Sequence, residues 1–407
     1  MTGQIAVTGI GLLTPAGLGV DATWDGLTSG RSFAATDPLL AGLPVDISCA
    51  LPGFTATEYI EHRLARRTDP FIHMAVAAAE QAVTDAHLVP GTADPSRIGV
   101  VLGVGGNSLL TYGAQHSRMA AGKFAHVSPL TVSRSVPSMA AGEVATYLDF
   151  RGPNFTVSSA CASGGNAIGV ARDLIRSGTC DIVLAGGAES GRSLLAAVAF
   201  ARTGALSTRL HDPAGASRPF DRDRDGFVLG EGAAVLVLER TEHARARKAA
   251  SRAMLVGYGA AADAHHPTDP HPDGRGLRQA ITAALADARL DPADIDHVSA
   301  HGTATPLGDP VEALVLRHVF ASAPPPVTAL KSTIGHALGA AAAIQAACAV
   351  LSLCHQAVPP TANLDNPDPE IDLDIVTKAP RSAALRTVLC NAAGFGGANT
   401  ALIFQTP

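Results

Sequence analysis

The sequence predicts an α/β fold built from two similar halves. Short apolar, β-branched segments alternate with helix-like segments along the chain, which is typical of strands buried on both faces. One order of parts occurs twice: strand, helix, strand with a glycine turn, buried helix, strand with a glycine turn. We therefore interpret the chain as a long internal duplication, with one half over residues 1–250 and the other over residues 251–407.

The individual elements follow from local composition. Strands of the first half are predicted at residues 5–9, 98–103, 155–159 and 182–187, and strands of the second half at residues 253–259, 297–302 and 388–391. An apolar stretch at residues 337–354 approaches the length of a membrane span. Because alanine dominates this stretch and no aromatic belt or basic cluster flanks it, we expect a helix buried in the core and no membrane association.

The composition is that of a globular protein with a large core. Hydrophobic residues make up 47% of the 407 residues and charged residues 16%, which excludes a largely disordered chain. The formal net charge of -6 argues against a general nucleic-acid binder. Six cysteines without a CxxC pair, and an N-terminus without a basic and then apolar leader, predict a reduced cytoplasmic protein without a signal peptide.

Three further segments lie outside the repeated pattern. Residues 46–71, which carry Arg63, Arg66 and Arg67, and residues 108–134 are long insertions in the first half. Such excursions usually cover a site or contact a partner. The charged segment 239–250 is predicted to be an exposed helix that connects the halves.

Cys161 is the candidate nucleophile. It follows a β-branched strand, lies in a turn of small residues and precedes a helix-like segment. This placement puts the sulfur at a helix N-terminus, where the helix dipole and free N–H groups lower the pKa of a thiol. The alternative interpretation is a buried cysteine that acts as a small hydrophobic residue.

Partners for this nucleophile come from the second half. His301 and His336 each lie beside a glycine, and Lys331, one of only four lysines, precedes His336 by five residues. The turn that contains Phe395 could present a backbone N–H to an oxyanion, opposite the N–H of Cys161. The alternatives are histidines satisfied at the surface or in the core, and an ordinary tight turn.

A histidine-rich segment at residues 263–273 offers enough ligands for a metal, with three histidines and three aspartates. Its three prolines scatter these side chains, and no helical spacing arranges them. We therefore predict a loop and no metal site.

Together these motifs resemble the β-ketoacyl-acyl carrier protein synthases of type II fatty acid and polyketide synthesis. The resemblance extends nearly end to end and rests on seven motifs in one order: VTGIG from Val7, SSACASGG around Cys161, ALSTR from Ala205, SRPFDRDRDGFVLGEGA from Ser217, HGTATPLGDPVEA from His301, KSTIGHALGAA from Lys331 and GFGGAN from Gly394. It implies the thiolase fold, whose duplicated βαβαβ halves form a five-layered α-β-α-β-α core related by a pseudo-dyad.

The resemblance also implies a catalytic set. Cys161 would accept the acyl chain, while His301 and His336 would bind a malonyl thioester and stabilise the enolate formed on decarboxylation. Lys331 and Glu312 would orient the histidine pair, and the N–H groups of Cys161 and Phe395 would form the oxyanion hole. No metal or cofactor is implied beyond substrates carried on the phosphopantetheine of acyl carrier protein.

Substrate and carrier contacts are implied in the same way. Thr303 and Thr305 match positions that hydrogen-bond the pantetheine arm, Phe395 and Phe200 match gating phenylalanines, and Arg63, Arg66 and Arg67 match a patch that docks the acidic carrier. A solvated helix face is the alternative for these arginines. Ala393 departs from the aromatic residue usual in the family, which predicts a wider site, and Tyr112 aligns loosely with a position that lines the pocket.

These implications predict a decarboxylating ketosynthase that elongates an acyl chain, with a preference for a type II polyketide pathway over primary fatty acid synthesis. The alternatives are a thiolase-like enzyme, a non-catalytic chain-length partner and a metal-dependent hydrolase. The family dimerises through the strand before the nucleophile, here residues 155–159, which implies a homodimer or a heterodimer with a chain-length factor.

Overall fold

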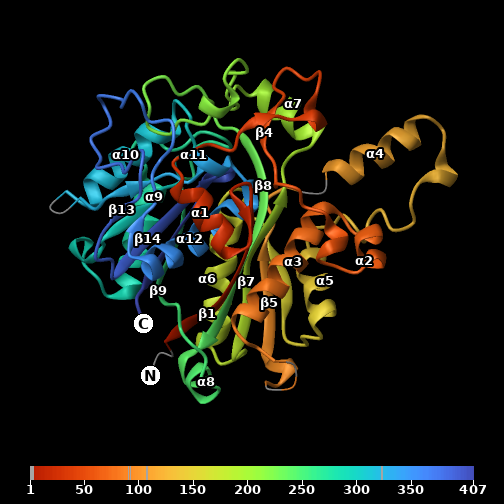
Figure 1. Ribbon diagram of the computed structural model, residues 1–407, viewed down its shortest axis with the longest axis horizontal. Helices are drawn as coiled ribbons and strands as arrows, with labels where there is room; N and C mark the ends of the chain where they lie inside the picture. The colour runs from red at the N-terminus through yellow and green to blue at the C-terminus, as the bar shows by residue number, and fades with distance from the viewer. Residues whose placement is uncertain (1–3, 90, 92, 107–108, 322–323) are drawn as a thin grey trace.

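The computed structural model describes the chain except residues 1–3, 90, 92, 107–108 and 322–323 (Figure 1). The first three residues of the predicted leaderless N-terminus, and Ser108 at the start of the second insertion, lie outside the described residues. The described chain forms a 13-stranded mixed sheet, a small second sheet, and helices that cover and separate the two halves of the large sheet.

Ten strands form the continuous path of the large sheet, in the order β11-β10-β14-β15-β9-β1-β8-β7-β5-β6. Their bounds are β1 Ile5–Thr14, β5 Ile98–Gly103, β6 Asn154–Val157, β7 Ile182–Ser190, β8 Leu229–Arg240, β9 Ala253–Ala262, β10 His297–Ser299, β11 Val327–Thr328, β14 Thr387–Gly394 and β15 Ala398–Gln405. The short strands β2 Gly17–Leu18, β3 Ala35–Thr36 and β4 Ile47–Cys49 attach to this path, and β12 Ala357–Val358 pairs with β13 Arg381–Ser382.

The helices alternate with these strands as predicted. They are α1 Val20–Thr28, α2 His62–Arg67, α3 Pro70–Asp85, α4 Leu109–Ala120, α5 Met139–Leu148, α6 Ser163–Arg176, α7 Leu194–Arg202, α8 Thr241–Ala246, α9 Arg275–Ala288, α10 Gly308–Val319, α11 Lys331–Ile334 and α12 Ala341–His355.

The two halves meet at the pairing of β1 with β9. This pairing is antiparallel and joins Ile5, Ala6 and Val7 to Leu255, Met254 and Ala253. Strands β1 and β5–β8 belong to the first half, and β9, β10, β11, β14 and β15 belong to the second. The predicted strands are present, whereas β8 and β15 are long strands that sequence reasoning did not single out.

Successive side chains along a strand point to opposite faces of the sheet and pack into different hydrophobic cores. These cores show how the sheets and helices are layered. In β5, Val100 and Leu102 pack with α3 and α5, whereas Val101 packs with α6 and α12. In β14, Leu389 packs with α9 and α10, whereas Val388 shares the central core with Val101. The layers are therefore outer helices, sheet, central helices, sheet and outer helices.

Small residues allow the central helices to approach closely. A Cβ atom at Gly164 of α6 would lie 2.7 Å from the backbone nitrogen of Ala343 in α12. The alanine-rich stretch from Leu338 to His355 is long and apolar enough to cross a membrane, but 89% of it is buried inside the protein. The expected core helix is confirmed, and its alanines serve close packing.

The connecting segment differs from the prediction. Its helix, α8, spans only Thr241–Ala246, and Glu239 lies at the end of β8 with no exposed surface. The Glu239 carboxylate accepts hydrogen bonds from Thr8, His243 and Arg247, so it is a buried anchor. The many charged residues of this segment predicted an exposed helix. The ion pair with Arg247 nevertheless allows the Glu239 carboxylate to be buried.

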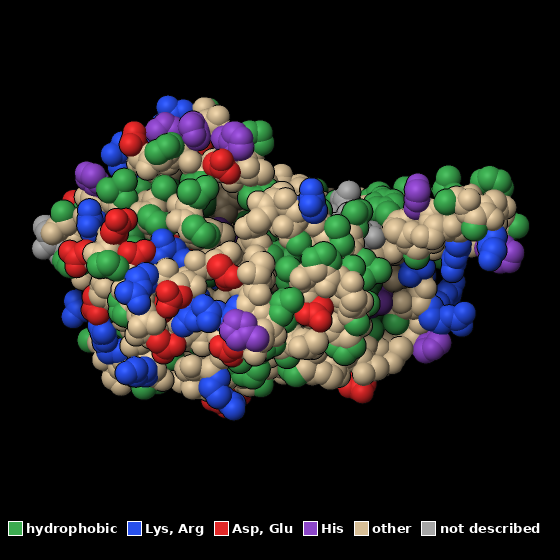
Figure 2. All heavy atoms as spheres, turned by 90° about the horizontal axis from the view of Figure 1, so that it is seen from above, with side chains coloured by type: hydrophobic (Ala, Val, Ile, Leu, Met, Phe, Trp, Pro, Cys, Tyr) green, Lys and Arg blue, Asp and Glu red, His purple; other side chains and the backbone are tan. Residues whose placement is uncertain are grey.

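The two insertions form separate features. The first contains α2 and runs into α3, while the second contains α4 and a loop that stands away from the body of the molecule (Figure 1). The same projection is seen from above in Figure 2. Its exposed apolar side chains include Met119, Phe124 and Val132.

Candidate active site

Cys161 lies in the turn between β6 and α6. Ala160, the residue before it, adopts a left-handed conformation with φ of 50°, which marks a strained turn. The backbone N–H groups of Cys161 and Phe395 act to lower the pKa of the Cys161 thiol. A Cβ atom at Gly394 would lie 2.8 Å from the carbonyl oxygen of Ser159, so only glycine lets the Phe395 turn approach.

His336 contacts Cys161 directly. Its Nε2 lies 3.1 Å from Cys161 Sγ, and the backbone N–H of Leu338 donates to its Nδ1 over 3.2 Å. Because Nδ1 accepts this hydrogen bond, the proton of the neutral ring is on Nε2. The His301 ring lies 5.6 Å away, centroid to centroid, at an angle of 87°.

Lys331 connects the two histidine segments. Its Nζ donates to the carbonyl oxygen of His301 over 2.6 Å and lies 3.4 Å from His301 Nδ1. The ammonium group therefore favours the His301 tautomer with the proton on Nε2. A third contact joins Nζ to the amide oxygen of Gln345 over 2.9 Å, and that residue was not predicted.

Glu312 acts on the backbone of the same segment. Its carboxylate accepts the N–H of His301 over 2.6 Å and that of Gly302 over 2.8 Å. Asn391 of β14 also donates to Glu312, over 2.6 Å. The structure thus brings Glu312 to the histidine segment, and within the described part of the chain it makes no direct hydrogen bond to Lys331.

Burial dominates the electrostatics of the site. It lowers the pKa values of His301 and His336 well below the ordinary range, with the Lys331 charge acting in the same direction, so both rings are neutral. Burial also lowers the pKa of Lys331 to about 8.

The predicted depression of the Cys161 pKa is wrong. Burial raises the pKa of this thiol to about 11, although Lys331 and two backbone N–H groups act to lower it. Sequence reasoning placed the sulfur at a helix terminus but did not include the cost of an anion in a desolvated cavity. The group at rest is a thiol.

A cavity of about 500 Å³ opens above these groups and is lined mainly by apolar surface. Ala393 and Phe395 line it, and the Phe200 and Phe395 rings lie 6.2 Å apart. Thr303 and Thr305 also line it, with their hydroxyl oxygens 3.0 Å apart. The arrangement offers a nucleophile, two neutral N–H donors and an oxyanion hole in one partly enclosed space.

Comparison with known proteins agrees with this geometry. Residues 2–244 match the family model described as beta-ketoacyl synthase, N-terminal domain, and residues 252–365 match the corresponding C-terminal domain. The chain belongs to the β-ketoacyl synthase family. It is thereby an acyltransferase.

Relatives of this synthase cover nearly the whole chain. It is 40% identical to the 3-oxoacyl-[acyl-carrier-protein] synthase 2 of Vibrio harveyi, over 99% of this chain and 98% of that protein. It is 39% identical to the protein of the same name from Synechocystis sp., over 99% of this chain and 98% of that protein.

Solved ketosynthase structures confirm the predicted α/β fold of the thiolase type. The ishigamide ketosynthase/chain length factor superposes with a TM-score of 0.94 at 35% identity, covering 100% of both chains. A type II polyketide ketosynthase solved with its acyl-carrier protein, AntDE:AntF, superposes with a TM-score of 0.92 at 30% identity, again covering 100% of both chains.

Two buried carboxylates of the synthase were missed by sequence reasoning. Asp309 accepts the backbone N–H groups of Phe220, Thr303 and Ala304, and burial raises its pKa to about 7. Glu189 lines the cavity and is considered below. The DPVEA sequence that follows the HGTAT motif carries Asp309 beside Glu312, which was the available signal for the first carboxylate.

Tyr112 is the predicted pocket residue that the structure does not bring to the cavity. It lies on α4, within the projecting insertion, and it is not among the residues that line the space above Cys161. The loose alignment failed because the insertion leaves the body of the protein near this position.

The three arginines of α2 have different environments. Arg63 and Arg66 are exposed, whereas Arg67 forms an ion pair of 2.8 Å with Glu143 of α5. Arg67 therefore ties α2 to the body of the protein, and its side chain is 42% exposed.

The histidine-rich segment forms a loop at the mouth of the cavity, between β9 and α9, as predicted. Thr268, Asp269 and Pro270 line the opening. His265 and His271 stack edge to face with centroids 4.9 Å apart, and the carboxylate of Asp263 accepts the amide of Asn399. Among the described residues no group of three metal-ligating side chains is found.

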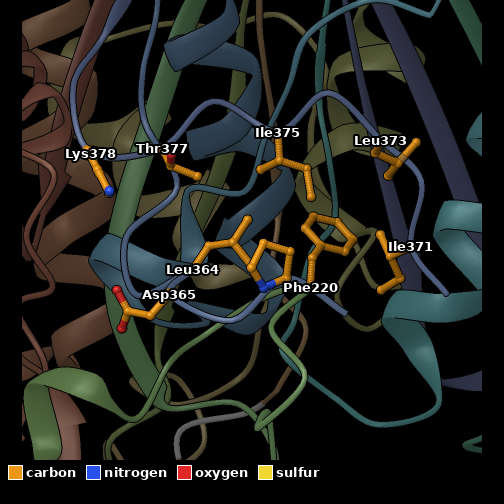
Figure 3. A pocket seen from close by; sticks show the side chains of 9 residues that line it. Phe220, Leu364, Asp365, Ile371, Leu373, Ile375, Thr377 and Lys378 are labelled. Atoms are coloured by element: carbon orange, nitrogen blue, oxygen red, sulfur yellow. The ribbon is translucent and has the colours of Figure 1, made fainter. Parts of the chain in front are cut away.

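A second cavity of about 340 Å³ is lined by Phe220 and by residues between Leu364 and Lys378 (Figure 3). Phe220 projects into it beside Leu364, Ile371 and Ile375, with Asp365 and Lys378 at one side. None of the predicted site residues lines this space. A Cβ atom at Gly302 would lie 3.5 Å from the Phe220 ring, so Phe220 packs between this cavity's lining and the segment that follows His301.

Proposed function

We propose that the chain elongates an acyl chain carried by acyl carrier protein, by decarboxylative Claisen condensation with a malonyl unit. The observation that carries this proposal is the contact of 3.1 Å between Cys161 Sγ and His336 Nε2, beside the N–H groups of Cys161 and Phe395. These groups provide a nucleophile, a proton donor and an oxyanion hole together.

In the first half-reaction, Cys161 attacks the acyl thioester. The thiol proton passes to solvent water as the sulfur bonds to the carbonyl carbon, and water later returns a proton to the departing pantetheine sulfur. The tetrahedral oxyanion accepts hydrogen bonds from the N–H groups of Cys161 and Phe395. The carbon–sulfur bond to the pantetheine then breaks, and the departing thiolate takes up this proton. The acyl chain extends into the apolar cavity past Phe200 and Phe395.

In the second half-reaction, the neutral rings of His301 and His336 donate through Nε2 to the thioester oxygen of the malonyl group. The carbon–carbon bond to the carboxylate breaks, carbon dioxide leaves, and its bonding pair forms the enolate that the two N–H groups stabilise. The enolate carbon attacks the acyl carbonyl, and the Cys161 thiolate departs. The product is a 3-oxoacyl chain on the carrier.

The pantetheine arm and the carrier would use the surfaces that the sequence indicated. Thr303 and Thr305 stand at the cavity mouth, where their hydroxyl groups can bond the amides of the arm. Arg63 and Arg66 offer exposed charge for an acidic carrier. No resident cofactor is needed by this chemistry.

We assign the chain to a type II polyketide pathway, with primary fatty acid synthesis as the second candidate. Ala393 supports this assignment, because the small side chain leaves room beside Phe395 in the cavity. The partner would be a second copy or a chain-length factor that pairs with the edge strand β6, where Phe155 is 37% exposed. The exposed apolar side chains of the projecting α4 segment fit the same partner.

Intact-protein mass spectrometry tests the function. The protein is incubated with a panel of acyl-carrier proteins and mapped by peptide, with Cys161→Ala as the control. We expect an acyl adduct on Cys161 that the variant lacks, and the preferred chain separates the two pathways. A folded protein that takes no acyl group from any carrier, alone or with a chain-length-factor partner, would contradict the proposal.

A further inference from the structure

Glu189 is a buried carboxyl group that the proposed mechanism does not use. It lies at the end of β7, it is 2% exposed, and it lines the same cavity as Cys161. An ionised carboxylate is costly in an apolar cavity unless hydrogen bonds compensate for its lost hydration. The hydrogen bonds that Glu189 accepts therefore show how its carboxylate is accommodated in the cavity wall.

One carboxylate oxygen of Glu189 joins two loops. Its Oε2 accepts the backbone N–H groups of Gly105 and Gly106 over 2.8 Å each, and that of Gly339 over 3.3 Å. Gly105 and Gly106 follow β5, whereas Gly339 belongs to the turn after His336. The side chain thus connects the first half of the protein to the second at the wall of the cavity.

The two loops pack against the segments that carry Cys161 and His336. A Cβ atom at Gly105 would lie 2.9 Å from the carbonyl oxygen of Ala160, the residue before Cys161, and 2.9 Å from the nitrogen of Gly339. Gly339 follows Leu338, whose N–H group sets the tautomer of His336. A displacement of either loop would therefore move the Cys161 and His336 groups relative to each other.

We propose that Glu189 is a positioning residue for the Cys161–His336 pair, and that its carboxylate, which lines the same cavity as Cys161, disfavours formation of the Cys161 thiolate. This inference rests on the proposed function, in which Cys161 is the nucleophile. The carboxylate acts through the Gly105–Gly106 and Leu338–Gly339 backbone rather than by contact with substrate.

The negative charge of Glu189 affects the pKa of Cys161. Burial raises the pKa of Glu189 to about 7 against the three N–H groups that lower it, so the group ionises around neutral pH. The charge of Glu189 raises the pKa of Cys161, whereas that of Lys331 lowers it. The charge of Asp69 also raises the pKa of Glu189. His301 and His336 line the same cavity as Glu189, and both rings are neutral.

The test is the pH dependence of Cys161 alkylation by iodoacetamide in the full-length protein, followed by peptide mass spectrometry between about pH 6 and about pH 9. Glu189→Gln removes the charge and keeps an oxygen that can accept the three N–H groups. We expect equal rates for variant and wild type at the acidic end, and a rate on the order of threefold higher in the variant at the alkaline end.

Control variants separate charge from structure. Glu242→Gln removes an exposed carboxylate of α8 and should leave the profile unchanged. Glu189→Leu removes the acceptor as well, and acyl transfer to Cys161 should fall by about tenfold or more, while Glu189→Gln retains most of it. If the leucine variant does not fold, the glutamine profile still decides the inference about charge.

Each outcome has a distinct meaning. A Glu189→Gln profile that superposes on the wild-type profile would overturn the inference about charge, and full acyl transfer by a folded Glu189→Leu protein would overturn the positioning role. A wild-type protein in which Cys161 is alkylated but never acylated would instead contradict the proposed function.

Discussion

The ammonium group of Lys331 lies 2.9 Å from the amide oxygen of Gln345, a neutral partner in the interior of the protein. The amide nitrogen of Gln345 donates in turn to the carbonyl oxygen of Ala300 over 2.7 Å. Gln345 thus fixes the lysine and the end of β10 together without neutralising the lysine charge. That charge acts on the neighbouring His301 and Cys161.

The substitution Gln345→Glu should stabilise the charged ammonium form of Lys331. A carboxylate beside Lys331 favours the charged ammonium, so the lysine pKa should rise above its value of about 8. Above that pH the wild type loses the lysine charge, and the variant should retain it. We expect the alkaline limb of the condensation rate to move to higher pH, by about one unit or more. An alkaline limb at the wild-type position would contradict this assignment.

Lys331→Met should make Cys161 less reactive. The positive charge lowers the pKa of the thiol, so its removal leaves less thiolate at a given pH. Since Lys331 is charged below about pH 8, the loss should be largest near neutral pH, on the order of tenfold in iodoacetamide rate, and should fade as the pH rises above 8. Lys378→Met, at an exposed position, is the matched control. Equal rates in Lys331→Met and the control at neutral pH would refute the coupling.

Reversal of charge at Arg66 should affect carrier binding. Arg66 is exposed, so Arg66→Glu should raise the KM for acyl-carrier protein by about tenfold with little change in kcat or thermal stability. The effect should weaken at high salt. Arg67→Glu should lower the melting temperature instead, because Arg67 pairs with Glu143. Unchanged carrier kinetics in Arg66→Glu would return this face to an ordinary solvated surface.

Ala393→Phe should narrow the cavity. Ala393 lines the space above Cys161, and a phenyl ring there would occupy volume next to Phe395. We expect transfer of bulky acyl chains to Cys161 to fall by about tenfold more than transfer of short chains. The acyl panel used for the wild type measures this ratio, with melting temperature as the check on folding. A proportional loss for all chains would show that Ala393 does not control chain choice.

Sequence alone determined the fold type and the candidate reacting groups. The strand, turn and helix around Cys161 are consecutive in the chain, so local composition was sufficient to place the sulfur between β6 and α6. His301, Lys331 and His336 could be recognised because each lies in a motif of adjacent residues. The alternation of strand-like and helix-like segments predicted an α/β fold, which the large mixed sheet with its helix layers confirms, whereas the division into two halves stays a prediction.

Only the tertiary structure decided the charges and the supporting contacts. The rise of the Cys161 pKa comes from burial by segments far apart in the chain, which no local pattern records. Gln345 and Glu189 had no motif of their own, because each acts on groups far along the chain: Gln345 on Lys331 and the Ala300 carbonyl, and Glu189 on the backbone of Gly105. Packing between distant segments also decides that Arg67 pairs with Glu143 and that Tyr112 lies away from the cavity. Local sequence sets which groups are present, while packing between distant segments sets their protonation, their partners and their access to the cavity.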